Sequence, residues 1–118
     1  MSDRLRLPQP IVAFIEATNG HHAGEFIATL TDSAVITDEG HEYRGIAAIK
    51  EWSDEKYLGA KVTLDLVDVI ERDGKTVVTA EVDGDFDKTG LPDPFHMDFH
   101  FTLEDHKIAA LNIRLAGE

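Results

Sequence analysis

Apolar residues recur at helical spacing in two stretches near the start of the chain. They return every third or fourth position over residues 9–18 and again over residues 21–30, which predicts one helix in each stretch. Pro8 and Pro10 stand where the first helix should begin, because proline is tolerated in a first helical turn but not deeper in a helix.

A short strand and a third helix are predicted next. Residues 34–38 form an apolar run closed by Asp38, which indicates a strand that ends in an acid. After a polar turn, Gly45 opens a helix whose inward stripe consists of Ile46, Ile49 and Trp52. We expect this helix to fray near residues 57–59.

The rest of the chain changes to a period of two, which is typical of strands. Apolar and polar side chains alternate over residues 61–70, 76–86, 95–103 and 108–116. The alternation slips between Leu66 and Val67, which indicates a β-bulge. The Asp-Gly pair of RDGK predicts a hairpin turn, and residues 87–94 are expected to form a longer loop. Helices grouped before an antiparallel sheet predict an α+β fold in which the sheet curls around the helices.

Composition narrows the class of protein. A length of 118 residues suits one domain, residues 1–118. No apolar run approaches the roughly 18 residues that cross a bilayer. A net charge of −12 without any basic run argues against nucleic-acid and membrane partners. The absence of cysteine excludes thiol chemistry and zinc–thiolate sites. Because no apolar signal-peptide segment follows the N-terminus, a cytoplasmic location is expected.

The element order, together with the stretch TDSAVITDEGHEYRGIAAIKEW over residues 31–52, resembles the nuclear transport factor 2-like superfamily. Within it, the chain is most similar to the branch of SnoaL-like polyketide cyclases and ketosteroid isomerases. The resemblance implies a cone-shaped, curved antiparallel (mixed) sheet wrapped around the N-terminal helices, with an apolar pocket at the open end. It also implies a homodimer that pairs through the outer face of the sheet.

The resemblance also implies roles for three residues. Asp38 matches the family's general base at the end of the first strand, and Asp98 matches its second pocket acid. Phe14 stands where the isomerases have a tyrosine that donates a hydrogen bond to the oxyanion. One of the two oxyanion donors is therefore missing, which argues against steroid isomerisation itself.

The residues around Asp38 allow two readings. On an alternating strand Asp38 shares a face with Ala34 and Ile36, so it points toward the pocket if those two side chains are in the core. Burial beside apolar walls would then raise its pKa and make it a usable base near neutral pH. Alternatively, Asp38 only ends a strand, since Asp-Glu-Gly is a favourable turn sequence.

His96, Asp98 and His100 share one face of a predicted strand. The other face carries five large apolar side chains (Phe95, Met97, Phe99, Phe101 and Leu103), which favour a core position and would send Asp98 outward. The resemblance favours the opposite orientation, and a dimer interface or a bulge could reconcile the two. No metal site is expected, because His96 and His100 would lie about 13 Å apart along a strand.

Tyr43 and Trp52 are amphipathic aromatic residues near the expected pocket mouth. Each is a candidate for the pocket wall, with a hydrogen-bonding tip, or for the core. With Phe14, His96 and His100 they complete the set of candidate ligand-binding residues.

These features support one catalytic hypothesis and two without catalysis. In the first, a small apolar ketone, enone or polyketide-like ring loses a proton to Asp38 without any cofactor, as in an isomerase, cyclase or dehydratase. Asp98 or a neighbouring histidine would hold the enolate oxygen. In the second, the pocket only binds a small apolar or aromatic ligand. In the third, the sheet face is an interaction surface.

Overall fold

The computed structural model describes residues 7–72, 75–85 and 95–116, which form three helices and six strands. In chain order these are α1 (Gln9–Gly20), α2 (Ala23–Ala28), β1 (Leu30–Asp38), β2 (His41–Arg44), α3 (Gly45–Lys56), β3 (Thr63–Arg72), β4 (Lys75–Asp83), β5 (His96–Glu104) and β6 (Lys107–Leu115). None of the described helices is long and apolar enough to span a membrane.

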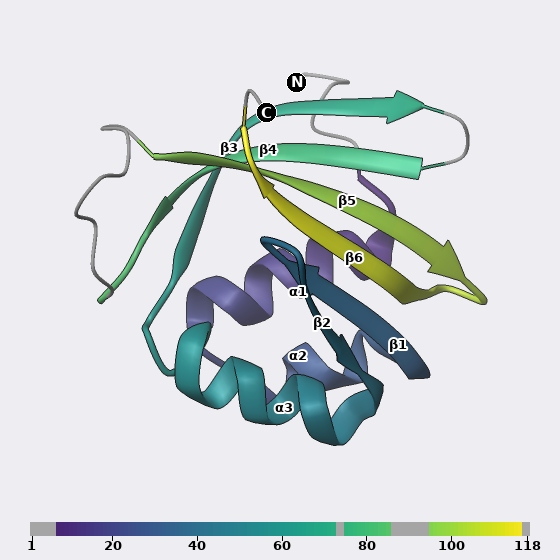
Figure 1. Ribbon diagram of the computed structural model, residues 1–118. Helices are drawn as coiled ribbons and strands as arrows, with labels where there is room; N and C mark the ends of the chain where they lie inside the picture. The colour runs from purple at the N-terminus through teal and green to yellow at the C-terminus, as the bar shows by residue number, and fades with distance from the viewer. Residues whose placement is uncertain (1–6, 73–74, 86–94, 117–118) are drawn as a thin grey trace.

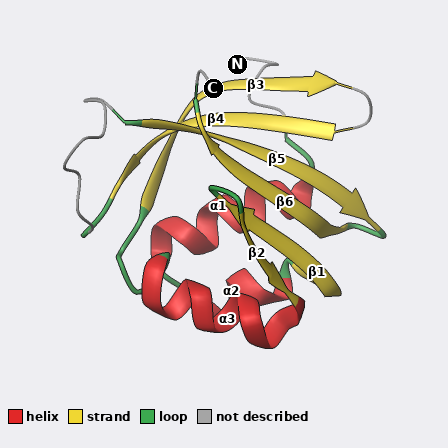
Figure 2. Ribbon diagram, viewed as in Figure 1, coloured by secondary structure: helices red, strands yellow, loops and turns green. Residues whose placement is uncertain are grey.

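The strands form one mixed sheet in the order β2-β1-β6-β5-β4-β3. Neighbouring strands are antiparallel except β1 and β6, which run parallel. The three helices gather on one side of the sheet, which curves over them (Figures 1 and 2). The expected α+β fold, with a curved sheet wrapped around N-terminal helices, is confirmed.

The core lies between the helices and the concave face of the sheet. Phe14 of α1 is fully buried, and its ring centroid lies 5.2 Å from that of Phe26 in α2 and 5.3 Å from that of Phe101 in β5. Burying a side chain of this size contributes about 1.5–3 kcal/mol. This aromatic cluster therefore fixes the helices against the sheet, and with them the elements that carry Asp38.

The chain between β1 and α3 differs from the expectation of a polar turn. Residues 41–44 form the strand β2, which pairs with β1 through a two-residue turn at Glu39 and Gly40. Both turn residues have positive φ angles, 49° and 86°, as in the hairpin turns whose twist matches that of paired strands. The sequence signal was weak because β2 is short and mostly exposed.

The boundary between α2 and β1 also differs from the expectation. Helix α2 ends at Ala28, not at residue 30, and β1 begins at Leu30, not at residue 34. The Thr29 hydroxyl donates to the Phe26 carbonyl at 2.7 Å, and the Thr29 carbonyl accepts from the Ile108 N–H of β6. This side-chain hydrogen bond and the contact with a distant strand end the helix early.

The β-bulge expected near Leu66 and Val67 is confirmed in β3. The pairing of β3 with β4 shifts register between Leu66 and Asp68, and Val67 at the bulge is 52% exposed. The predicted hairpin turn at residues 73–74 and the loop over residues 87–94 lie outside the described residues.

Helix α1 is tied to the start of β3 by one side chain. Asn19 donates from Nδ2 to the Leu64 carbonyl at 3.1 Å, and its Oδ1 accepts the Leu64 N–H at 2.7 Å. The amide group thus pairs with β3 as the backbone of a neighbouring strand would. It sets the position of β3 just after Val62, which lines the pocket described next.

Candidate functional site

Asp38 is held on both sides at the end of β1. Its backbone pairs with His41 across the β1–β2 hairpin and with Ile113 of the parallel strand β6. Its side chain is half-buried on the same face as the buried Ala34 and Ile36, as expected from the alternation. The Trp52 Nε1–H of α3 donates to Asp38 Oδ2 at 3.2 Å. The carboxylate therefore has a fixed orientation toward the helices.

The surroundings of Asp38 favour its neutral form. Burial raises the pKa of this carboxyl above its ordinary value of 3.8, and the Trp52 hydrogen bond and the charges of His41 and Lys56 offset part of that rise. A carboxylate that has lost part of its hydration binds a proton more tightly than one in water. Asp38 is therefore a stronger base than an aspartate on the surface.

Tyr57, directly after α3, brings a hydroxyl group close to Asp38. Its ring stacks on Trp52 with centroids 5.0 Å apart, and its hydroxyl lies 2.9 Å from Thr18 Oγ1. Thr18 uses its only hydroxyl proton on the Phe14 carbonyl at 2.9 Å, so Tyr57 is the donor to Thr18. Burial, reinforced by the charge of Asp38, raises the pKa of Tyr57 far above its ordinary value. Tyr57 therefore stays protonated, with its proton directed into the core.

Asp38, Trp52 and Tyr57 line a pocket of about 240 Å³. The other residues that line it are Glu39, Lys56, Val62, Val82, Phe95, Met97, Phe99 and Ile113. Six of these eight are apolar and come from the sheet or its connections. The volume is below the range of about 300–1,000 Å³ that is typical of pockets for drug-sized ligands. The pocket therefore suits a small and mostly apolar ligand.

Strand β5 presents its apolar face to this pocket and its polar face away from it. Met97, Phe99 and Phe101 are buried, whereas His96, Asp98 and His100 are half-buried on the outer face of the sheet. The only register shift between β5 and β6 lies beyond Asp98, between Thr102 and Leu103, so no bulge reverses the alternation near it.

The second pocket acid and the two histidines that the sequence suggested do not line the pocket. On the outer face Asp98 Oδ1 accepts a hydrogen bond from the Thr79 hydroxyl at 2.5 Å. Burial and the nearby Arg114 lower the pKa of His100 on the same face, although the charge of Asp98 raises it in part. The resemblance pointed inward, but burial of the large apolar side chains decided the orientation.

The remaining candidates divide between pocket and core. Trp52 lines the pocket and is 3% exposed. Tyr43 packs on Trp52 with ring centroids 5.7 Å apart but does not line the pocket, and Phe14 is a core residue. Within the described residues, no group of three or more His, Cys, Asp or Glu side chains is placed to hold a metal ion.

Sequence reasoning missed Lys56 and Tyr57 as pocket residues. Tyr57 lies five positions after Trp52, outside the helical spacing of three or four that would have placed the two on one face. The rings of Trp52 and Tyr57 meet because α3 ends at Lys56 and the chain turns there. The Gly59 N–H donates to the Ser53 carbonyl in this turn.

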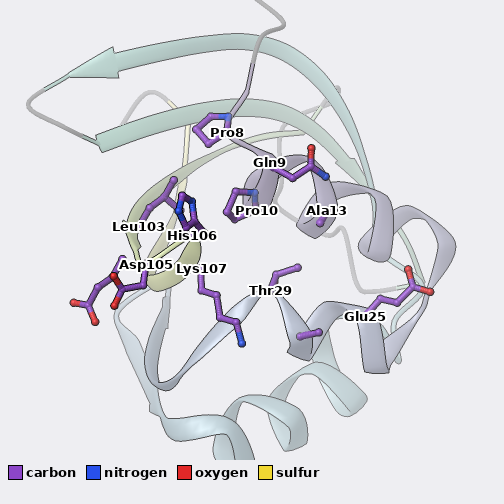
Figure 3. Close-up of a pocket in the computed structure, with 12 residues that line it drawn as sticks. Pro8, Gln9, Pro10, Ala13, Glu25, Thr29, Leu103, Asp105, His106 and Lys107 are labelled. Atoms are coloured by element: carbon purple, nitrogen blue, oxygen red, sulfur yellow. The ribbon is translucent and has the colours of Figure 1, made fainter.

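A larger depression of about 870 Å³ lies elsewhere on the molecule, between the start of α1, the end of α2 and the β5–β6 hairpin (Figure 3). Pro8 and Pro10 face Leu103, His106 and Lys107 across it. Its greater size does not make it the better candidate. Among the described residues that line it, the buried polar side chain is Thr29, whose hydroxyl proton already goes to the Phe26 carbonyl, whereas the smaller pocket contains the desolvated Asp38.

Comparison with known proteins agrees with the fold. The SnoaL-like domain family matches residues 11–111. Among solved structures, a candidate polyketide cyclase of Sinorhizobium meliloti is 24% identical, with a TM-score of 0.82 over 96% of this chain and 100% of that one. A candidate ketosteroid isomerase of Kribbella flavida is 10% identical, with a TM-score of 0.73 over 94% of this chain and 78% of that one.

A third solved structure adds a bound small molecule. It is a protein of Catenulispora acidiphila with a ketosteroid isomerase-like fold, in complex with trimethylamine. It is 15% identical to this chain, with a TM-score of 0.74 over 95% of this chain and 88% of that one. No curated protein matches the chain significantly. Identities this low establish the shared fold, and the family match extends over most of the chain. The protein therefore belongs to the SnoaL-like domain family and has the nuclear transport factor 2-like fold.

Proposed function

We propose that this protein binds a small apolar carbonyl compound and that Asp38 acts as a general base on it. The substrate would place the carbon next to its carbonyl group against the Asp38 carboxylate, with its apolar part between Phe99, Met97 and Val62. The C–H proton moves to Asp38, and its return to a different carbon gives an isomer. Alternatively, the enolate carbon attacks a second carbonyl carbon of the same substrate, whose oxygen takes the proton back from Asp38, and a ring is formed. No cofactor takes part in these steps.

The observation that supports this proposal is the environment of the Asp38 carboxylate. It is half-buried, its pKa is raised by burial, and one of its oxygens is fixed by the Trp52 N–H at the edge of an apolar pocket. A surface aspartate that merely ends a strand needs none of these features. The pocket volume of about 240 Å³ favours a substrate of one or two small rings, or a short chain, over a steroid.

The experiment that tests the proposal measures hydrogen exchange at carbon. Small ketones and enones are incubated with the protein in heavy water, and deuterium uptake next to the carbonyl is followed by mass spectrometry. Wild-type protein should catalyse uptake for at least one member of the panel. Asp38→Asn should lower that rate by about 10²–10⁴-fold, which is the usual contribution of a general base.

A matched substitution controls for the loss of an acid. Asp98→Asn removes the other aspartate that sequence comparison nominated, but on the outer face of the sheet. It should leave the exchange rate unchanged. Equal rates for the wild type and Asp38→Asn would contradict the proposal.

A second candidate function is the binding of an organic ammonium ion without catalysis. The trimethylamine found with the Catenulispora acidiphila protein favours it, as does a carboxylate beside the stacked rings of Trp52 and Tyr57. The positive charge of Lys56 at the same pocket disfavours it. Thermal stabilisation by trimethylammonium chloride, without deuterium uptake by any ketone, would support this function over catalysis.

The outer face of the sheet is the surface proposed to pair two copies of the chain. A depression of about 400 Å³ on this face is lined by the cations Arg44, Lys75 and Arg114 and by one acid, Glu42, which pairs with Arg44 at 2.8 Å. The balance of charge there is positive, although the protein as a whole is strongly acidic. Asp68 and Asp98 lie beyond it on the same face, both opposite Thr79. A two-fold axis would place the cations of one copy against the acids of the other.

A further inference from the structure

If Asp38 is the base, the pocket must also contain a group that stabilises the charge formed on the substrate. Removing a proton next to a carbonyl group leaves negative charge on the oxygen, and catalysis requires a donor or a cation there. Among the described lining residues, the side chains that can donate are those of Trp52, Lys56 and Tyr57. A donor can act on a substrate only if its hydrogen is not already bonded to another group of the protein.

Two of the three donors are already engaged. The Trp52 Nε1–H donates to Asp38 Oδ2, and the Tyr57 hydroxyl donates to Thr18, whose own proton goes to the Phe14 carbonyl. Turning Tyr57 toward a substrate would leave a fully buried hydroxyl chain without its donor, at a cost of about 1–3 kcal/mol. Neither group is free to meet an oxyanion.

Lys56 is the donor that remains. It lies in the last turn of α3, directly before Tyr57, and lines the same pocket as Asp38. Its side chain takes part in no hydrogen bond or ion pair with the described residues. A lysine can lay its aliphatic stem on an apolar wall and keep its charge at the rim. Such a charge is available to a ligand that enters beside Asp38.

We propose that the Lys56 ammonium group stabilises the enolate oxygen that forms when Asp38 removes its proton. The inference rests on the proposed function of Asp38. The C–H electron pair becomes the new C=C bond, the carbonyl π electrons move to the oxygen, and that oxygen pairs with Lys56 Nζ. The substrate carbonyl therefore points toward the rim of the pocket. Lys56 would take the role that the sequence comparison had given to Asp98.

A structural explanation for Lys56 also exists and must be separated from this one. The helix dipole favours a cation in the last turn of a helix, whichever way the side chain of that cation points. Lys50 provides the matched control, because it lies on the same helix but pairs with Asp54 on the exposed side and does not line the pocket.

The test measures binding of 4-nitrophenolate, a small coloured anion whose oxygen and flat ring resemble an enolate. Asp38→Asn serves as the background, because a neutral side chain there imitates Asp38 after it has taken the proton and removes its repulsion. Phenolate binding is titrated by absorbance. Adding Lys56→Met should weaken binding at least about tenfold, since a charged hydrogen bond is lost.

Two further variants make the result specific. Lys56→Arg in the same background should retain most of the affinity, because it keeps a cation at the rim, and Lys50→Met should change nothing. Equal phenolate affinity with and without Lys56→Met would overturn the proposal, and so would a background protein that binds no phenolate. Either result would leave the exchange experiment on Asp38 standing, because that experiment measures turnover and not anion binding.

Discussion

At the scale of single residues, the protein keeps the Asp38 carboxylate partly out of water at the expense of stability. Its pKa is raised by burial, so the folded protein binds this proton more tightly than the unfolded chain. The contribution of Asp38 to the free energy of unfolding is fully present below the ordinary pKa of 3.8 and is lost as pH rises through the folded pKa. An acid retained under this cost is typical of functional sites.

Asp38→Asn is therefore expected to stabilise the fold at neutral pH while it lowers the rate of hydrogen exchange at carbon. The amide oxygen can still accept the Trp52 N–H, and no charge has to be buried. Thermal unfolding should show a higher midpoint for Asp38→Asn than for the wild type at pH 7, and the difference should disappear below pH 3.8. The exposed Asp32→Asn, also on β1, controls for the loss of one charge from an acidic protein. A destabilised Asp38→Asn at pH 7 would show that the carboxylate contributes to the fold.

Part of the site at this scale could be predicted, because Asp38 and Trp52, two of the seven candidate residues, line the pocket. Asp38 shares a face with Ala34 and Ile36 because side chains alternate along a strand, which is a local property of the sequence. That this face is the buried one was decided by the fold. The roles of Lys56 and Tyr57 could not be predicted, because they depend on where α3 ends and how the chain turns after it. That turn brings the Tyr57 hydroxyl to Thr18 of another helix, a contact that no local pattern encodes.

At the scale of secondary-structure elements, one amide side chain determines where α1 meets β3. Asn19→Ala should lower the free energy of unfolding by roughly 1–2 kcal/mol, because the backbone N–H and C=O of Leu64 lose their partners. Chemical denaturation measures this change. Asn112→Ala on the outer face makes the same substitution where only a long contact with Arg114 is lost, and should cost less than about 0.5 kcal/mol. Equal losses for the two variants would mean that the Asn19 contact contributes nothing.

The two predictions for Asp98, inward or outward, are resolved by the packing of the whole strand β5. Alternation alone placed Met97, Phe99 and Phe101 on one face and Asp98 on the other, and the remaining question was which face meets the core. Burial of the three large side chains contributes about 1.5–3 kcal/mol each, which outweighs any preference of one aspartate for the pocket. The order and type of the long elements were predictable for the same reason. The short β2 was not, because four mostly exposed residues carry little pattern.

At the scale of the whole molecule, the outer face of the sheet is expected to form a homodimer. Sedimentation equilibrium should give a dimer that weakens as salt concentration rises, because part of the attraction is between charges. Ile70 is 43% exposed and lies opposite Val77, on the row of this face that continues to His100. Ile70→Lys should shift the protein to monomer by placing an unpaired charge in the interface.

A change away from the sheet separates this effect from a general one. Lys50→Glu changes a charge on α3, and α3 lies on the side of the sheet opposite to its outer face (Figure 1). This variant should leave the dimer intact. A monomeric wild type at high protein concentration, or a dimer that tolerates Ile70→Lys, would rule out pairing through this face.

The sequence by itself determined the α+β class, the alternation of each long strand, the bulge near Val67 and the face that Asp38 shares with Ala34 and Ile36. Each depends on side chains a few positions apart, because the periods of helix and strand are local. Tertiary structure alone decided that Asp98 faces outward, that Asn19 holds β3, and that Lys56 and Tyr57 complete the pocket with Asp38. Those outcomes depend on the curvature of the sheet and on contacts between distant segments, where burial of the whole core sets the geometry.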